Sequence, residues 1–171
     1  MFTRSIQPFL VMCIVMLAGP VLAEDGPGCL DCHTADAESP VHVIFNSVHG
    51  NLMGGGAAAC TACHGPSEAH DRRGRRNPPD VSFGPTWISE LEVRNGACQS
   101  CHEGDKQLLW LGSEHEQENL ACTDCHNSHT QSDPALNTDT AGDQCLTCHS
   151  RQRAQMKLPS RHPIAEGKTA C

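Results

Sequence analysis

The sequence predicts a fold that is mostly irregular, with short α-helices. Three observations lead to this prediction. Aromatic residues make up 4% of the 171 residues and tyrosine is absent, so an ordinary apolar core would be thin. Fifteen glycines and eleven prolines interrupt the chain often, and no alternating strand pattern stands out. Ten of the twelve cysteines recur in five Cys-x-x-Cys-His units.

The first 23 residues have the pattern of a secretory signal peptide. Arg4 provides a positive charge, Phe9 to Leu17 form an unbroken apolar run, and a small-residue cleavage site ends at Ala23. An uncleaved membrane anchor is the alternative, although the run is short for a bilayer. We therefore expect residues 1–23 to be a cleaved signal peptide and residues 24–171 to be one domain in the periplasm.

The five Cys-x-x-Cys-His units have the spacing that attaches a c-type haem. Two thiols add across the two vinyl groups of one porphyrin. Positions i, i+3 and i+4 share one face of a helical turn, so the histidine is directed at the iron. The expected attachment residues are Cys29, Cys32, Cys60, Cys63, Cys98, Cys101, Cys122, Cys125, Cys145 and Cys148, and the expected iron ligands are His33, His64, His102, His126 and His149.

Three other uses of cysteine pairs fit the sequence less well. Disulfides suit an exported protein but do not require a histidine after every pair. Structural zinc sites use pairs of pairs and have no need of five identical triplets. Thioredoxin-like chemistry needs a βαβ context, which the sequence pattern lacks. Haem attachment is therefore the favoured interpretation. We expect residues 24–171 to form one pentahaem cytochrome c domain, with loops and short helices wrapped around a chain of covalently bound haems.

Six further histidines lie outside the motifs: His42, His49, His70, His115, His129 and His162. Five irons need at most five more ligands, so we expect bis-His coordination throughout. His42 lies between two valines in an apolar run and is expected to be the spare histidine. A six-coordinate iron has no open position for a substrate, which favours electron transfer over catalysis. A multihaem reductase acting on nitrite or hydroxylamine would need an open iron, which this histidine supply does not indicate.

Close packing of neighbouring haems is a further expectation. His126 and His129 are three residues apart, which would place both on one helical turn. His129 then could not reach the far face of the haem that His126 ligates, and would ligate another one. His49 precedes Gly50, which allows a close approach of the backbone. We expect haems near enough to one another for rapid electron hopping.

The segments between the motifs predict loops and short helices. Helices are expected at Trp87–Asn95 and Asp143–Lys157, with a further turn at Lys106–Leu111. The stretch HDRRGRRNPPDVSFGP, residues 70–85, is predicted to be an exposed loop because it is rich in Pro, Gly and Arg. Its arginines either dock an acidic partner or are simply solvated. They are Arg72, Arg73, Arg75 and Arg76.

Four segments, CTACHGPSEAH, WLGSEHEQENLACTDCHNSH, CLTCHSRQRAQ and SRHPIAEGKTAC, together resemble the decahaem periplasmic cytochromes of the MtrA/DmsE type. The resemblance extends over nearly all of the mature chain. It implies a cytochrome held in an outer-membrane β-barrel, which passes electrons from periplasmic donors to an extracellular cytochrome or reductase. The first half also resembles the soluble pentahaem cytochromes of the NrfB type, which feed a periplasmic nitrite reductase.

The resemblance also implies distal ligands at His49, His70, His115, His129 and His162, and none at the position of His42. The resembling family has ten haem motifs, whereas this chain has five. Cys171 lies 26 residues after Cys145, close to the preceding intervals of 24 and 23, so we expect it to begin a sixth motif in which the chain breaks off. The expected function is a respiratory electron conduit, with no enzyme activity, nucleic acid or small-molecule substrate. The alternative is a complete soluble pentahaem shuttle to a nitrite-type reductase.

Overall fold

The computed structural model describes residues 28–33, 40–73, 76–102, 104, 109–164 and 166–169. The expected signal peptide, Cys171, Arg75 and the first part of the turn predicted at Lys106–Leu111 lie outside these residues. Within the described ranges, no helix is long and apolar enough to cross a membrane.

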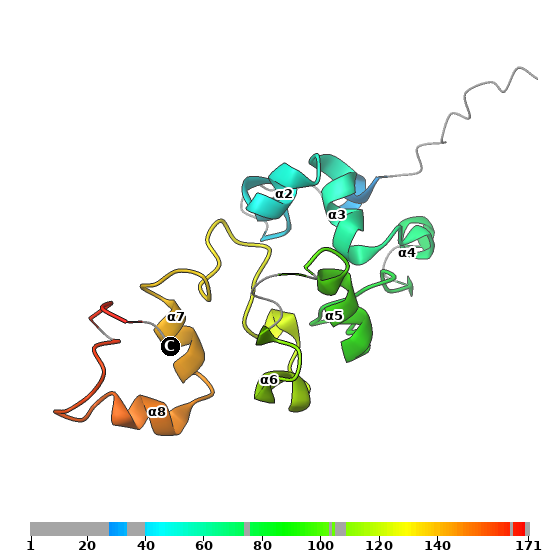
Figure 1. Cartoon of the computed structure of the whole chain (residues 1–171). Helices are drawn as coiled ribbons and strands as arrows, with labels where there is room; N and C mark the ends of the chain where they lie inside the picture. Colours follow the sequence, from blue (N-terminus) through cyan, green and yellow to red (C-terminus); the bar gives the residue numbers. More distant parts are fainter. Residues whose placement is uncertain are drawn as a thin grey trace, which may run out of the picture.

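The described chain folds into short helices joined by loops (Figure 1). In chain order the elements are α1 (Cys29–Cys32), the 3-10 helix η1 (Pro40–Asn46), α2 (Val48–Leu52), α3 (Gly56–His64), α4 (Glu68–Arg73), α5 (Leu91–Gln99), α6 (Glu114–Gln117), the 3-10 helix η4 (Cys122–Asp124), α7 (Ala141–Leu146) and α8 (Ser150–Gln155). The described residues form no β-strand, and a single isolated bridge pairs Phe83 with Ile88. The predicted fold class is therefore confirmed.

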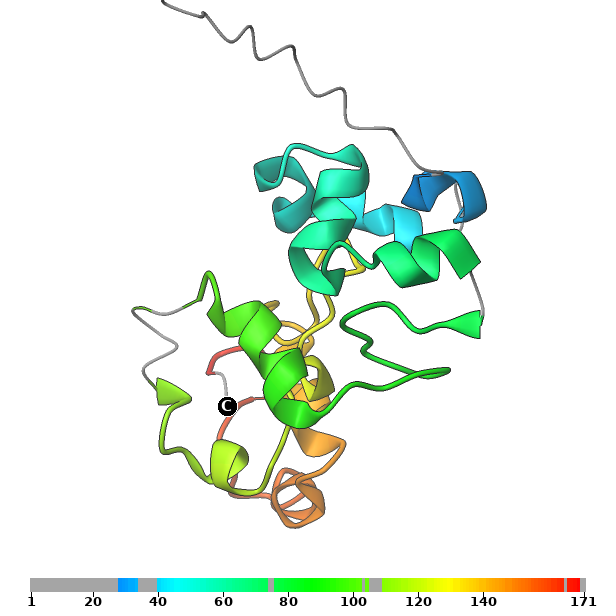
Figure 2. The ribbon, with the colours of Figure 1, turned by 90° about the vertical axis from the view of Figure 1, so that its right-hand side faces the viewer.

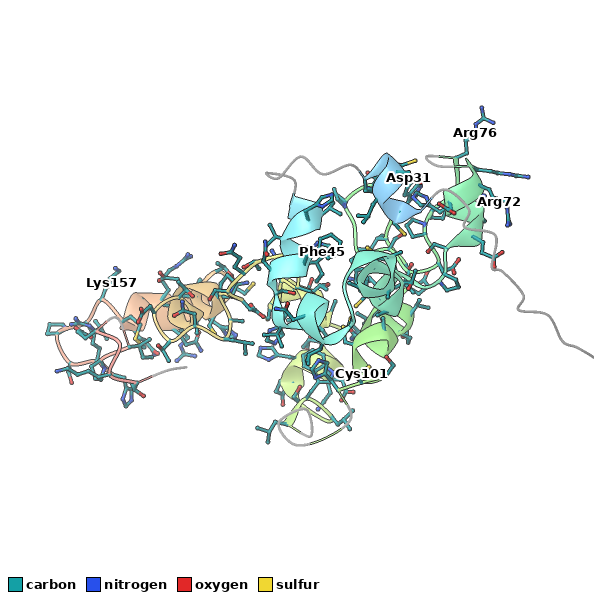
Figure 3. The ribbon with its side chains drawn as sticks, turned by 90° about the horizontal axis from the view of Figure 1, so that it is seen from above. Asp31, Phe45, Arg72, Arg76, Cys101 and Lys157 are labelled. Carbon is teal, nitrogen blue, oxygen red and sulfur yellow. The ribbon has the colours of Figure 1, made fainter. Side chains whose placement is uncertain are left out.

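Helix α3 lies at the centre of the first part of the structure, where it contacts α1, η1 and α5. Helix α5 in turn contacts η4, and α7 contacts α8. Figures 1 and 3 show α7, α8 and the segment after them as a lobe beside the rest of the molecule. Figure 2 shows the first helices, in blue and cyan, at one end and this lobe, in orange and red, at the other. The haem motifs thus follow one another along the molecule.

Apolar burial within the described residues is sparse. The buried apolar side chains are Ile44, Ala59 and Ala121, and no large side chain is fully buried. Leu52 and Leu109 are each 80% exposed, although burying a leucine would stabilise a fold by about 1.5–3 kcal/mol. The expected thin core is confirmed, and much apolar surface is left for a partner or a prosthetic group.

The helix predicted at Trp87–Asn95 begins later than expected, at Leu91, and ends at Gln99. The residues before it turn back on the preceding segment. The amide of Ser89 donates to the carbonyl of Ser82 (2.9 Å), and the amide of Ser82 donates to the hydroxyl of Ser89 (2.9 Å). These bonds take up the backbone that would have formed the first helical turn, so the prediction for Trp87–Glu90 was wrong.

The helix predicted at Asp143–Lys157 is two helices, α7 and α8, separated at Thr147–His149. The break falls in the fifth motif, where His149 leaves the helical conformation with φ −83° and ψ 67°. The predicted loop at residues 70–85 also begins inside α4. Figure 3 shows Arg72 and Arg76 pointing away from the protein, and Arg72 pairs with Glu68 at 3.3 Å.

Candidate haem sites

Each Cys-x-x-Cys-His unit forms a turn of helix. In four of the units the histidine amide donates to the carbonyl of the first cysteine, and the second unit lies within α3. The four bonds are His33 to Cys29 (2.9 Å), His102 to Cys98 (3.0 Å), His126 to Cys122 (2.9 Å) and His149 to Cys145 (3.2 Å). This is the local geometry expected from the i, i+3, i+4 spacing, with both thiols and the ring on one side.

The residue before the second cysteine fastens the turn in four of the five units. Its side chain bonds the backbone of the residue before the first cysteine, which closes the unit on itself. The pairs are Asp31 with the amide of Gly28 (2.8 Å), Asp124 with the amide of Ala121 (2.7 Å), Ser100 with the carbonyl of Ala97 (2.8 Å) and Thr147 with the carbonyl of Gln144 (2.7 Å). Sequence reasoning missed these residues, although Asp, Ser and Thr are the types that bond local backbone.

Four motif histidines each face a histidine from another part of the chain. The distances between ring centres are 6.2 Å for His33 and His70, 6.4 Å for His64 and His129, 5.9 Å for His102 and His49, and 5.9 Å for His149 and His115. A metal–imidazole bond is about 2 Å long, so two rings on opposite sides of one iron have their centres roughly 6 Å apart. Each pair therefore has the spacing that a bis-His iron requires.

His64 is oriented by the segment that follows α4. Its Nδ1 donates to the carbonyl of Val81 (2.9 Å), and the amide of Val81 donates to the carbonyl of His64 (3.2 Å). The hydroxyl of Ser67 also donates to the carbonyl of His64 (2.7 Å), while its own amide donates to Asp80 (2.8 Å). With Nδ1 engaged, Nε2 is the ring nitrogen left for a metal.

His70 is oriented in the same manner, because its Nδ1 donates to the carbonyl of Asn77 at 2.7 Å. The edge of its ring also meets Trp87, with centres 5.9 Å apart. A backbone carbonyl therefore fixes the tautomer of both His64 and His70.

His49 depends on the glycine beside it. Ser47 caps α2 by accepting a bond from the amide of Gly50 (3.3 Å), and its hydroxyl donates to the carbonyl of Ile44 (2.7 Å). A Cβ on Gly50 would lie 2.1 Å from that carbonyl oxygen. The expected close approach of the backbone is therefore confirmed, and it places α2, which carries His49, against η1.

The expected helical turn from His126 to His129 is not formed. Helix η4 ends at Asp124, and the amide of His129 donates to the side chain of Asn127 (2.9 Å) in a local turn. This side-chain bond replaces the backbone bond that a continuing helix would make. The prediction of a helical turn was therefore wrong. The ring of His129 faces His64 of the second motif, so it lies at another motif than His126, as the sequence led us to expect.

Three histidines differ from the four pairs. Nε2 of His42 lies 2.8 Å from the carbonyl of His33, and its ring meets the edge of Phe45, which are structural contacts. His126 donates from Nδ1 to Asp133 at 2.7 Å. His162 is exposed, and in the described part of the chain no ring contact joins it to His126.

Thiols of consecutive motifs lie close enough to influence one another. Burial raises the pKa of the Cys98 thiol to about 11, and the neighbouring Cys122 thiol adds to this effect. Burial, then Cys29, raises the pKa of Cys60 in the same way. The pKa of Cys63 is raised by burial and by Cys101. These contacts join the first motif to the second, the second to the third and the third to the fourth.

The fourth and fifth motifs are also near one another. The pKa of the Cys125 thiol is raised by burial, by Asp124 and by Cys148 of the fifth motif. Between the third and fourth motifs, Asn95 of α5 forms a direct link: its Oδ1 accepts from the amide of Cys122 (2.9 Å), and its Nδ2 donates to the carbonyl of Leu120 (3.3 Å). The motifs therefore follow one another in space in their order along the chain.

None of the ten motif cysteines is paired in a disulfide in this structure. Among the residues described, no group of three or more His, Cys, Asp or Glu side chains is placed to hold a bare metal ion. The donor set that is present consists of thiol pairs, each followed by a histidine, which is the set that covalent haem uses.

Comparison with known proteins agrees with this donor set. Residues 60–142 match the family model of the cytochrome c-type protein NrfB-like family. The multihaem cytochrome MtrA of Shewanella baltica (strain OS185) is 36% identical over 149 residues, which cover 84% of this chain and 43% of that protein. The chain belongs to the MtrA family of multihaem cytochromes. This MtrA-family chain spans less than half the length of the curated relative it matches.

Membership of the MtrA family confirms the resemblance inferred from the sequence and implies covalently attached haem. The site geometry fits this cofactor at the level of the chain's own residues. Each motif presents two thiols and a histidine on one turn, and four of the motif histidines face a second ring at the spacing described above. The NrfB-like region, residues 60–142, contains three complete motifs and three of the expected distal histidines, which are His70, His115 and His129.

Proposed function

We propose that this chain carries electrons through five covalently attached haems, as part of a conduit between the periplasm and the outer membrane. Multihaem cytochromes of the MtrA and NrfB types are electron carriers rather than enzymes, and membership of that group supports electron transfer here. The observation that carries the proposal is the set of four histidine ring pairs with centres 5.9–6.4 Å apart. Two imidazoles per iron leave no open position for a substrate.

The ring pairs assign the axial ligands. His70 is proposed for the iron of the first motif, His129 for the second, His49 for the third and His115 for the fifth. His162 is the remaining candidate for the iron of the fourth motif, where His126 is the motif ligand. In each of the four ring pairs the distal histidine comes from a segment between two other motifs, so each of these haems would tie distant parts of the chain together. When bound, the haems supply iron that cycles between Fe(III) and Fe(II).

The polypeptide sets the order of the five sites. Thiols of successive motifs lie near one another, and Asn95 joins the third motif to the fourth by two hydrogen bonds. The exposed apolar side chains, among them Leu52 and Leu109, are surface that porphyrin rings would cover. These features support a line of closely spaced carriers rather than five isolated ones.

We propose export by a cleaved signal peptide at residues 1–23, a periplasmic location with outer-membrane association, and electron donors in the periplasm. The proposed partners are an outer-membrane β-barrel and an extracellular cytochrome or reductase. Similarity to the multihaem cytochrome MtrA supports this assignment.

A second candidate function is a soluble pentahaem shuttle that docks transiently to a nitrite-type reductase. The match of residues 60–142 to the NrfB-like family favours it. The two functions differ in the partner that must be present, because a conduit has to deliver electrons across a membrane whereas a shuttle needs only a soluble reductase.

The first test is the haem content and spin state of the chain, expressed with a c-type maturation system. Intact mass is expected to show five haems, and EPR of the oxidised protein is expected to show low-spin ferric haem. Fewer than five haems, or high-spin haem at most sites, would overturn the proposal.

The second test separates conduit from shuttle. Liposomes that contain an outer-membrane barrel protein and an enclosed electron acceptor are mixed with the reduced cytochrome. Reduction of the enclosed acceptor only when both proteins are present supports the conduit. Electron delivery to a soluble nitrite reductase, with none across the membrane, would favour the shuttle.

A further inference from the structure

The fourth motif differs from the first two sites in the group that accepts a hydrogen bond from its histidine. Nδ1 of His64 and Nδ1 of His70 donate to backbone carbonyls, whereas Nδ1 of His126 donates to the carboxylate of Asp133 at 2.7 Å. A carbonyl orients a ligating imidazole. A carboxylate orients it and also makes the opposite ring nitrogen a stronger electron donor.

Asp133 is held in place by its own turn. Its Oδ1 accepts from the amide of Ala135 (3.0 Å), while its carbonyl accepts from the amides of Leu136 (3.0 Å) and Asn137 (3.2 Å). The side chain of Asp133 is 16% exposed, whereas that of His126 is 51% exposed. The carboxylate is thus largely removed from water and held by its own turn, which strengthens its interaction with the ring.

A second carboxylate faces the same motif. Asp124 accepts from the amide of Ala121 (2.7 Å) inside the fourth Cys-x-x-Cys-His turn. Asp124 and Asp133 both lie close enough to the Cys125 sulfur to act on it electrostatically. Two negative charges therefore reach the sulfur that would anchor the fourth haem. The residue directly before the second cysteine, which is Asp124 in this motif and Asp31 in the first, is uncharged in the other three motifs: Ala62, Ser100 and Thr147.

We propose that Asp133 is a positioning residue that fixes the tautomer of His126 and lowers the reduction potential of the fourth haem. This inference rests on the proposed function, in which His126 ligates that haem. A strongly donating ligand and nearby negative charge both stabilise Fe(III) over Fe(II), and hydrogen bonding to an axial ligand is one of the means by which a protein sets a haem potential.

The fourth site lies between the third and the fifth, so its reduction potential affects electron transfer along the chain. Cys98 of the third motif lies beside Cys122, and Cys125 lies near Cys148 of the fifth motif. Electrons that pass between the third and fifth sites therefore cross the fourth one. A lowered potential there forms an energetic step between the first three sites and the lobe that carries α7 and α8.

The test uses the full chain with all haems attached, as wild type and as Asp133→Asn. Midpoint potentials are measured by spectroelectrochemical titration, and EPR follows the ferric signals. We expect Asp133→Asn to raise one of the five midpoint potentials by at least 59 mV. At a fixed applied potential, this shift increases the Fe(II)/Fe(III) ratio of that haem at least tenfold, because the couple transfers one electron. The other four potentials are expected to stay in place, and one low-spin EPR signal is expected to change.

Two further variants complete the experiment. Asp139→Asn is the matched control, because Asp139 is an exposed residue of the same segment and bonds no histidine through its side chain. Asp133→Glu keeps a carboxylate as the hydrogen-bond acceptor, so its potential is expected to stay closer to the wild-type value than to that of Asp133→Asn.

The outcomes separate the inference from the function on which it rests. Five haems with all five potentials unchanged in Asp133→Asn would overturn the inference alone. If Asp133→Asn does not assemble five haems, Asp133→Glu decides the question. An Asp133→Glu protein in which one potential rises by 59 mV or more, the shift expected for removal of the charge, would reduce Asp133 to a folding role and overturn the inference as well. A wild-type chain with fewer than five haems would overturn the proposed function.

Discussion

Gly50 offers the sharpest test of how the backbone positions a distal ligand. In Gly50→Ala the new Cβ would lie 2.1 Å from the carbonyl oxygen of Ile44 and 2.8 Å from Cα of Phe45. Both atoms belong to backbone, so no side chain can rotate away. Relief requires α2 to move away from η1.

The size of that movement follows from the contact distance. Ordinary van der Waals contact begins at 3.4 Å, so the separation from the Ile44 oxygen has to grow from 2.1 Å by about 1.3 Å. His49 precedes Gly50 directly and moves with it. Because metal–ligand distances tolerate deviations of only about 0.2 Å, we expect His49 to leave the iron that it is proposed to share with His102. Overpacking of this kind also destabilises a fold by about 1–3 kcal/mol.

The assay is EPR of the oxidised protein, together with thermal unfolding followed by circular dichroism. Gly50→Ala is expected to convert one of the five haems to the high-spin form and to lower the melting temperature. The matched control is Gly96→Ala in α5, close to Cys98. A Cβ there meets nothing within 4 Å, so all haems should stay low-spin and stability should rise by about 0.4–1 kcal/mol. A Gly50→Ala protein with five low-spin haems and the wild-type melting temperature would refute the reasoning.

Three other substitutions test separate parts of the structure. Asn95→Ala removes both hydrogen bonds that join α5 to the fourth motif and leaves the partly buried amide of Cys122 without its acceptor. We therefore expect the free energy of unfolding to fall by about 1–3 kcal/mol, and an unchanged chemical denaturation curve would contradict this. His42→Ala removes a hydrogen bond to the carbonyl of His33 and is expected to lower the free energy of unfolding by about 0.5–1.5 kcal/mol while every haem stays low-spin. A new high-spin EPR signal in this variant would instead identify His42 as an iron ligand. His162→Ala is expected to turn one haem high-spin in visible and EPR spectra, and spectra identical to those of the wild type would remove His162 from the proposed ligand set.

The haem motifs could be located from the sequence because their chemistry is local. Two thiols and a histidine at i, i+3 and i+4 need only one helical turn, and the structure forms that turn at every motif. The thin core was predictable for a similar reason, since composition alone limits how much apolar surface a chain can bury.

Local reasoning was wrong where a bond to another segment, or to a neighbouring side chain, competed with the helix. Trp87–Glu90 is extended because Ser82 and Ser89 bond to one another across a turn. The turn expected at His126–His129 is replaced by a bond from the amide of His129 to Asn127. Neither competitor has a helical period that a sequence pattern would reveal.

The pattern of five motifs and the supply of further histidines were therefore determined by the sequence, because spacing and composition are properties of the chain itself. The pairing of the rings was decided only by the tertiary structure. His49, before the second motif, faces His102 in the third, and His129, after the fourth, faces His64 in the second. Such pairs depend on contacts among α3, α5 and η1, and no local spacing encodes them. The same holds for Asp133, which is one aspartate among many until the fold brings it to the ring of His126.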